Sequence, residues 1–263
     1  MSHPRRAPKP SGRLTARLDI DLDDFKGFKS HSLVAPLRER YRRAGLLAEH
    51  AIVRLVEDLE ALNEIHIETH GRVAFTAVQG RVKQEDRFLA KILSTCREQA
   101  KAQGVTAATL DASFAGIKDL AGVRFSCPYF DEVVPAVNEL VRPSFGTKGY
   151  GTDLRAEPGY DDRNYLENGD RFGYRSYHFY VRIPTVVDIY GGVEMCLCEV
   201  QARTELQHVW ADKSHDLLYK PSIDWNEPDE QIVALMKQVS NNLRAVDGYL
   251  VDIRHRVRGE KSS

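Results

Sequence analysis

The chain of 263 residues contains no apolar run that approaches the ~20 residues needed to cross a bilayer. It also lacks the apolar stretch that follows the basic residues of a secretory signal, because the N-terminal segment MSHPRRAPKPSGR continues into polar sequence. Both absences argue against a membrane-associated or exported protein. We therefore expect a cytoplasmic protein with no membrane partner.

Cysteine is scarce, and its spacing excludes the common zinc sites. The four cysteines form no CxxC pair and have no histidines at zinc-ligand spacing. Cys196 and Cys198 alternate with Leu197 and Glu199, which is typical of one face of a strand. We expect all four to be buried free thiols, the usual state of unpaired cysteine.

Net charge is also nearly absent. The formal charge of −1 does not indicate a nucleic-acid binder. The charge is uneven along the chain, since the first 17 residues hold five bases and no acid, and four acids lie between positions 19 and 24. Two interpretations stay open for this segment: a disordered, solvated leader, or a basic arm that meets a polyanion.

The overall composition is that of an ordinary globular protein, with 42% hydrophobic and 29% charged residues, which is sufficient for a hydrophobic core. Helical periodicity predicts helices at 33–66 (broken near Gly45), at 85–103, at 130–141 and from Thr204 onward. Alternation and β-branched residues predict strands at 72–83, 119–127, 174–184 and 193–203. The stretch 143–172 has no period, and a loop of that length in a compact domain is usually functional or disordered.

A long C-terminal helix is expected after Asn226 and Pro228, which have N-cap and first-turn character. Its apolar residues follow steps of four and three: Ile232, Met236, Val239, Leu243, Val246, Leu250, Ile253 and Val257. Such a heptad pattern predicts a buried seam, packed either on the domain's own helices or on a second subunit. We expect a flexible tail at 1–30, one domain at 31–220 and this helix at 221–263.

Two acids fall in or beside apolar strands. Asp119 opens one predicted strand and Glu199 lies inside another, where a carboxylate is costly unless it is paired or metal-bound. Together they suit Mg²⁺, which prefers one or two carboxylates plus phosphate oxygens. Two separate salt bridges, with Arg124 and Arg203 as partners, explain the same pattern equally well.

Cations and aromatic residues give weaker signals. Arg81, Lys83, Lys91 and Arg124 flank predicted strands and helix starts, and such groups suit phosphates and flat bases. Tyr174 stands where the irregular loop meets a strand, so it is a candidate to stack a base or to anchor the core.

Four motifs in order carry a resemblance. The segments GRVK (80–83), DLAGVR (119–124), GYRSYH (173–178) and EVQART (199–204), followed by Trp210 and DKSHDLLYK, are similar to the synthetase motifs of the RelA/SpoT alarmone synthetases. The resemblance covers roughly residues 70–220. It implies an α/β (α+β) fold: a mixed β-sheet flanked by helices, related to nucleotidyltransferases.

The resemblance also implies roles. Arg81 and Arg124 would sandwich the adenine of ATP, while Lys83 and Lys91 would hold its phosphates. Asp119 and Glu199 would bind Mg²⁺, and Glu199 would help to deprotonate the acceptor 3′-hydroxyl, which attacks the β-phosphorus and expels AMP. The acceptor would be bound by Tyr174, stacked on its base, and by Arg175 and His178. The expected enzyme is a synthetase-only pyrophosphokinase, and a degenerate nucleotide-binding regulatory module is the non-enzyme alternative.

One departure from the family pattern bears on the acceptor. Lys-Asp-Tyr and Pro-Lys are replaced in the loop before Tyr174, and residues 142–172 hold five bases against six acids. A near-neutral loop is a poor cradle for a 5′-polyphosphate. GDP or GTP therefore stays the first expectation, with the 3′-terminal adenosine of tRNA and an adenine nucleotide as alternatives. The tRNA alternative resembles the family's toxins and adds an antitoxin protein as a partner.

The long family members also have a hydrolase half, which this chain lacks. His215 and Asp216 form an HD pair within the synthetase ending, and no other His/Asp set accompanies it at metal spacing. A hydrolytic metal site needs several ligands, so we expect this pair to be structural.

Overall fold

The computed structural model describes residues 21, 23–103, 105–155, 157, 159–186, 192–214, 217 and 229–259. The basic leader, the HD pair, and the expected caps Asn226 and Pro228 lie outside these residues. The chain divides into two compact units: residues 1–42 with 84–117, and residues 43–83 with 118–263. None of the described helices is long and apolar enough to cross a membrane.

The first unit is helical. It contains α1 (Phe25–Ser30), the 3₁₀ turn η1 (Ser32–Val34), the start of α2 (Ala35–His70), α3 (Glu85–Gln103) and α4 (Ala107–Ala115). Phe88 on α3 is 1% exposed and packs against the rings of Tyr41 and Phe114. Helix α4 was missed from sequence, although Thr106 and Thr109 form a capping box at its start.

The second unit is built on a five-stranded mixed sheet of order β1-β2-β5-β4-β3. The strands are β1 (Ala77–Val82), β2 (Ala121–Cys127), β3 (Arg163–Asn164), β4 (Tyr177–Val186) and β5 (Val193–Thr204). Strands β2 and β5 pair in parallel, and the other pairs are antiparallel. Residues 72–76 of the predicted first strand are not in the sheet.

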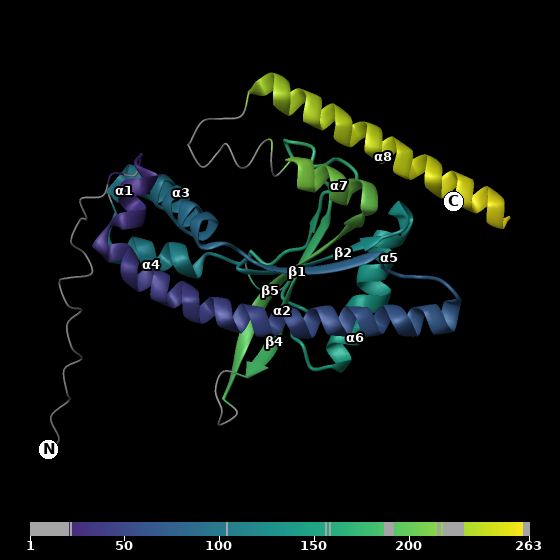
Figure 1. Ribbon diagram of the computed structural model, residues 1–263, viewed down its shortest axis with the longest axis horizontal. Coiled ribbons are helices and arrows are strands. Elements are labelled where there is room, and N and C mark those ends of the chain that lie inside the picture. The colour runs from purple at the N-terminus through teal and green to yellow at the C-terminus, as the bar shows by residue number, and fades with distance from the viewer. Residues whose placement is uncertain are drawn as a thin grey trace, which may run out of the picture. The chain divides into compact units, whose positions relative to one another are not determined.

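One face of this sheet is covered by the C-terminal part of α2 and by the segment η2 (Phe130–Glu132), α5 (Val133–Pro135), η3 (Ala136–Val141) and α6 (Arg142–Thr147), as Figure 1 shows. The expected helix at 130–141 is therefore a succession of 3₁₀, α and π turns. The main core lies here, where Ile52, Leu55 and Leu59 of α2 meet Phe125 and Val200 of the sheet.

The cysteines are free thiols, as expected from sequence. Cys96, Cys127 and Cys198 are buried, but Cys196 is only partly buried, contrary to the expectation for all four. Cys196 lies in the first half of β5, whose residues Val193–Leu197 are exposed or only partly buried.

Helix α2 runs unbroken through Gly45, contrary to the predicted break. A glycine inside a helix costs only about 1 kcal/mol relative to alanine, and the apolar stripe of a 36-residue helix outweighs that cost. A Cβ at Gly45 would meet nothing within 4 Å, so the glycine marks no close packing.

Helices α7 (Glu205–Ser214) and α8 (Glu230–Arg258) belong to the opposite side of the sheet (Figure 1). Trp210 and Met236 form a second core cluster there, and the Trp210 indole donates to the carbonyl of Met236 at 2.8 Å. The mixed sheet flanked by helices confirms the fold class expected from sequence.

The predicted seam of α8 is mostly not buried within this chain. Met236 is buried, but Ile232, Val239 and Val246 are 41–46% exposed. The helix turns a polar stripe inward instead, and the members of that stripe are 0–8% exposed: Ser240, Asp247 and Arg254. Each of these three has hydrogen-bond partners on the domain, which is why burial is tolerated.

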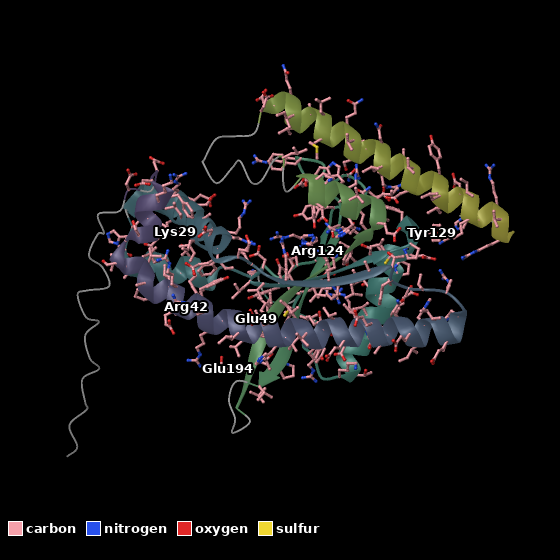
Figure 2. The ribbon with its side chains drawn as sticks, in the orientation of Figure 1. Lys29, Arg42, Glu49, Arg124, Tyr129 and Glu194 are labelled. Carbon is pink, nitrogen blue, oxygen red and sulfur yellow. The ribbon has the colours of Figure 1, made fainter. Side chains whose placement is uncertain are left out.

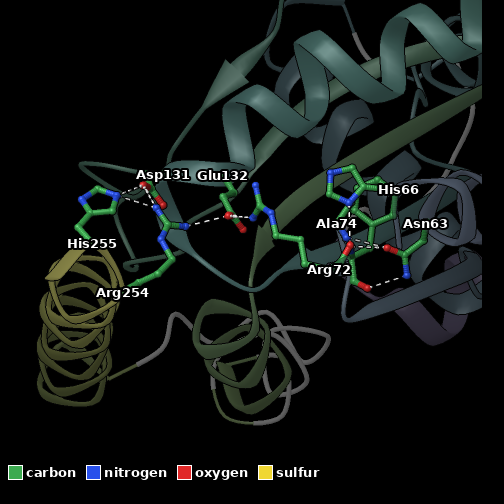
Figure 3. A network of polar contacts seen from close by, with 9 residues as sticks. Asn63, His66, Arg72, Ala74, Asp131, Glu132, Arg254 and His255 are labelled. Atoms are coloured by element: carbon green, nitrogen blue, oxygen red, sulfur yellow. Dashed lines mark hydrogen bonds and ion pairs between the residues drawn. The ribbon is translucent and has the colours of Figure 1, made fainter. Parts of the chain in front are cut away.

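The C-terminal end of α8 is held by the network in Figure 3. The Arg254 guanidinium contacts both Asp131 and Glu132, and His255 faces Asp131 at 3.3 Å. Glu132 also pairs with Arg72, in the connection between α2 and β1. The network therefore joins α8 to two separate parts of the same unit.

Candidate active site

The two faces of the sheet differ sharply in polarity. Ala121, Val123, Phe125 and Cys127 of β2 all enter the main core. Successive side chains of a strand point to opposite faces, so the residues between core positions lie on the other face. On β1, β2, β4 and β5 these are mostly polar: Gln79, Arg81, Gly122, Arg124, Ser126, His178, Tyr180, Arg182, Glu199, Gln201 and Arg203.

Strand register aligns this polar face into rows. Arg81 pairs with Gly122, Gly122 with Glu199, and Glu199 with Tyr180. In the next row Arg124 pairs with Gln201, which pairs with His178. Gly122 carries no side chain, and a Cβ added there would lie 3.8–3.9 Å from atoms of Arg81 and Glu199. Segments more than 100 residues apart thus meet on one surface.

Glu199 is the central acid of this surface and is 8% exposed. Its carboxylate lies 3.3 Å from His178 Nδ1 and accepts hydrogen bonds from Tyr180 at 3.4 Å and from Gln201 at 2.7 Å. Burial by itself would raise the pKa of Glu199, but contacts with His178 and Gln201 outweigh it and lower the pKa. The group is therefore held as a carboxylate. The salt bridges proposed from sequence are not formed, because Arg124 and Arg203 bond elsewhere.

Asp119 lies just before β2 and pairs with Lys83 at 2.8 Å. Its negative charge is felt by Glu199, whose pKa it pushes upward. Two carboxylates within electrostatic reach on one face, beside a lysine, fit a hard cation that takes its remaining ligands from phosphate oxygens. The donor set thus suits Mg²⁺, and the assignment of Asp119 and Glu199 as its ligands stays a prediction.

The predicted adenine clamp is brought to the same face. Arg81 is exposed on β1, and Arg124 lies between the sheet and α7, as Figure 2 shows. Burial and the charges of Arg203 and Arg81 lower the pKa of Arg124 to about 10. A set of mutually repelling cations is favourable ground for an anionic ligand. Lys91 belongs to α3 of the other unit, where it is exposed, so its part in ATP binding stays a prediction.

Tyr174 lies beside this surface and is partly exposed. Its hydroxyl is 3.0 Å from His178 Nε2 and donates to Gln201 at 3.3 Å, while its ring contacts those of Tyr165 and Trp210. Burial raises the pKa of Tyr174 above its usual value, so the phenol stays neutral. Through His178 and Gln201, the ring proposed to stack the acceptor base is hydrogen-bonded to the same groups as Glu199.

Arg175 is placed differently from its neighbours. It is 4% exposed, and its guanidinium donates to the carbonyls of Leu166 and Glu167 and to Ser240 and Asn241 of α8. In this arrangement Arg175 fastens the loop to α8, and its direct role in acceptor binding stays a prediction.

Gly173 explains how the loop comes so close to α8. Its φ of +95° is a conformation that other residues rarely adopt, and an added Cβ would lie 3.0 Å from atoms of Lys237 and Ser240. Ser240 also donates to the Gly173 carbonyl. A glycine is therefore required at the junction that sets the position of Tyr174.

Four polar residues of this region were missed as site candidates: Gln201, Arg203, His208 and Asp212. The signal for the first two was present, because Glu199, Gln201 and Arg203 follow the period of two that puts them on one face of β5. No sequence signal marked His208 and Asp212, since their importance depends on where α7 lies over the sheet.

Comparison with known proteins agrees with this architecture. A family model described as "Region found in RelA / SpoT proteins" matches residues 80–224. The GTP pyrophosphokinase YjbM of Bacillus subtilis is 29% identical over 189 residues, which covers 72% of this chain and 75% of that protein. The GTP pyrophosphokinase YwaC of the same organism is 27% identical, covering 54% of this chain and 60% of that protein.

Solved structures show the same fold. Small alarmone synthetase 1 from B. subtilis, bound to its product pppGpp, superimposes with a TM-score of 0.65 at 25% identity, covering 83% of this chain and 98% of that one. Small alarmone synthetase 2 from B. subtilis gives a TM-score of 0.58 at 20% identity, covering 81% and 97%. The second match bears on the fold alone.

Proposed function

The chain belongs to the RelA/SpoT family and is a pyrophosphokinase, and from that premise we propose that it transfers the β,γ-pyrophosphate of ATP to the 3′-hydroxyl of GDP or GTP. The observation that carries the proposal is the polar face of the sheet. There a buried carboxylate, Glu199, stands in one row with Arg81 and is hydrogen-bonded to groups that contact Tyr174.

In this proposal the side chains have separate tasks. Arg81 and Arg124 hold the adenine of ATP, Lys83 holds its phosphates, and Tyr174 stacks the acceptor base. Asp119 and Glu199 are the ligands for Mg²⁺, which when bound supplies positive charge to the phosphate oxygens. Phosphoryl chemistry of this kind depends on positioning and charge more than on covalent catalysis.

Glu199 also acts on the proton of the acceptor. The 3′-oxygen forms a bond to the β-phosphorus while the bond from that phosphorus to the oxygen of the α-phosphate breaks and AMP leaves. Glu199 accepts the hydroxyl proton, since a ribose hydroxyl is a poor nucleophile at neutral pH. His178 and Gln201 support this role because their hydrogen bonds hold Glu199 in its charged form.

A second acceptor, the 3′-terminal adenosine of tRNA, is favoured by one observation. Three of the five bases between positions 142 and 172 are committed to acids: Arg142 to Asp162, Lys148 to Asp58 and Arg155 to Asp153. Little charge remains in this segment for a 5′-polyphosphate, which a tRNA 3′ end does not carry. An antitoxin protein is a proposed partner only in this case.

One experiment separates these acceptors. The protein is incubated with ATP labelled in the γ-phosphate and with GDP, GTP, ADP or bulk tRNA, and the products are separated by size. We expect label in a guanosine tetra- or pentaphosphate, together with AMP release. Label in the tRNA fraction alone would overturn the GDP/GTP assignment, and ATP binding with no transfer to any acceptor would indicate a nucleotide-binding module instead.

A further inference from the structure

Helix α7 places His208 and Asp212 one helical turn apart, where they contact two arginines of the sheet. Arg203 donates from Nη2 to His208 Nδ1 at 2.7 Å, and His208 Nε2 faces Asp212 at 3.7 Å. Arg124 donates to the other oxygen of Asp212 at 3.4 Å. The four side chains thus form one chain of contacts, from Arg203 on β5 to Arg124 on β2.

The protonation of His208 follows from its neighbour. A guanidinium has only donors, so the Nδ1 atom that receives the Arg203 hydrogen bond must carry a lone pair. The remaining proton is then on Nε2, the atom that faces Asp212. Burial and the charge of Arg203 lower the pKa of His208, in agreement with a neutral ring. His208 can therefore accept the Arg203 hydrogen bond and direct a proton toward Asp212 only in this one tautomer and ring orientation.

The two ends of the chain of contacts belong to different parts of the proposed site. Arg203 is 1% exposed, and its guanidinium lies 6.0 Å from the ring centroid of Tyr174, the residue proposed to stack the acceptor base. Arg124 is proposed to hold the adenine of the donor. Arg203 and Arg124 repel each other, and the contacts of His208 and Asp212 link their two side chains.

We propose that His208 is a positioning residue that joins the donor and acceptor subsites, fixing Arg203 beneath Tyr174 through Nδ1 and Arg124 through Nε2 and Asp212. The inference rests on the proposed function, because it gives Arg124 and Tyr174 their roles. His208 touches neither nucleotide in this view. It acts by orienting the two side chains that do.

Two conservative substitutions test the Arg203 contact and the Asp212 contact of His208 separately. In His208→Asn the amide oxygen replaces Nδ1 as the acceptor for Arg203, but the contact with Asp212 is lost. In His208→Gln the longer amide reaches the position of Nε2 and keeps the Asp212 contact, while the acceptor for Arg203 is lost. His208→Ala removes both. Val209→Ala, at an exposed site on the same helix, is the matched control.

The measurement is the KM for ATP and the KM for whichever acceptor takes the label, with thermal unfolding measured in parallel. Loss of the Arg203–His208 hydrogen bond corresponds to about a fivefold effect. The His208–Asp212 contact of 3.7 Å is longer than a hydrogen bond, so its loss has a smaller effect, about twofold. We expect His208→Asn to raise the KM for ATP about twofold with the acceptor KM unchanged. We expect His208→Gln to raise the acceptor KM about fivefold with the KM for ATP unchanged, and His208→Ala to raise both. Val209→Ala should change neither.

Equal changes in both KM values for the Asn and Gln variants, or changes only in unfolding temperature, would overturn the inference and leave His208 a structural residue. Unchanged KM values in His208→Ala would overturn it as well. These outcomes are distinct from failure of the proposed function, in which the unaltered protein itself transfers no label to any acceptor.

Discussion

The charge of Glu199 is set by the opposition of burial and hydrogen bonding. Burial favours the neutral acid, whereas His178, Gln201 and Tyr180 all direct donors at the carboxylate. The balance lowers its pKa, so the group keeps the charge that both metal binding and proton acceptance need. This is the residue on which the proposed chemistry depends most directly.

Glu199→Gln should abolish transfer while leaving the fold intact, since the amide has nearly the same shape but no charge. We expect the rate to fall by more than tenfold, a loss of at least ~1.4 kcal/mol of transition-state stabilisation. Labelled transfer measures the loss, and circular dichroism checks the fold. Glu194→Gln, at an exposed position on the same strand, is the control and should keep full activity. A Glu199→Gln variant with more than about a tenth of the rate would refute the assignment.

His178→Ala should change the pH dependence of turnover. Removal of the imidazole leaves burial to dominate, so the pKa of Glu199 should rise. Because the reaction needs the carboxylate, activity is lost as pH falls through that pKa, and the acid limb of kcat should move to higher pH than in the unaltered protein. Profiles of kcat against pH test this. His50→Ala, exposed on α2, should leave the limb in place, and an unmoved limb in the His178 variant would contradict the explanation.

At the scale of elements, α8 is unusual in turning polar side chains inward. Asp247 accepts from Thr204, at the end of the EVQART segment, and from Gln207 of α7. Ser240 and Asn241 bind Arg175 in the loop that carries Tyr174. The helix therefore braces two parts of the site at once. Its outward face carries the exposed members of the heptad pattern, and a second subunit would suit this face: Ile232, Val239, Val246, Leu250, Ile253 and Val257.

Leu243 and Val246 of α8 should respond differently to a charge. Leu243 packs on the Trp210 cluster, so Leu243→Asp should destabilise the fold by roughly 1–3 kcal/mol. Val246 is 41% exposed, and Val246→Asp should leave the unfolding temperature of the single chain nearly unchanged. Thermal unfolding of the two variants measures this difference, and equal losses of stability would show that the buried and exposed faces of α8 are misassigned. If α8 joins subunits, light scattering should report a folded monomer for the Val246 variant.

For the whole molecule, loss of the proposed Mg²⁺ should abolish activity without unfolding the protein. Asp119 is already paired with Lys83, and Glu199 with His178, so neither carboxylate depends on a cation for its place. We expect EDTA to abolish transfer without altering the unfolding temperature, and added Mg²⁺ to restore activity. Transfer that persists at full rate in excess chelator would exclude the proposed metal role.

Four strands and the longer helices were predictable because they depend on local periodicity, whereas the short helix α4 was missed. The alternation of Met195 to Arg203 and the three- and four-residue steps of α2 give the elements directly from the chain. The four ordered motifs likewise identified the family before any coordinates. Their order along the chain does not depend on how the strands pair.

Which side chains bond to one another was decided only by the tertiary structure. Sequence allowed Arg203 to be a salt-bridge partner of Glu199, yet the strand places it next to His208 of α7, while Glu199 meets His178 from β4. The sequence also left undetermined which face of α8 packs on the rest of the domain. Its heptad pattern predicts a buried apolar seam, but the hydrogen bonds of Ser240, Asp247 and Arg254 rotate the polar stripe inward. Local sequence determines which residues share a face of a helix or strand, whereas only the packing of distant segments determines what that face meets.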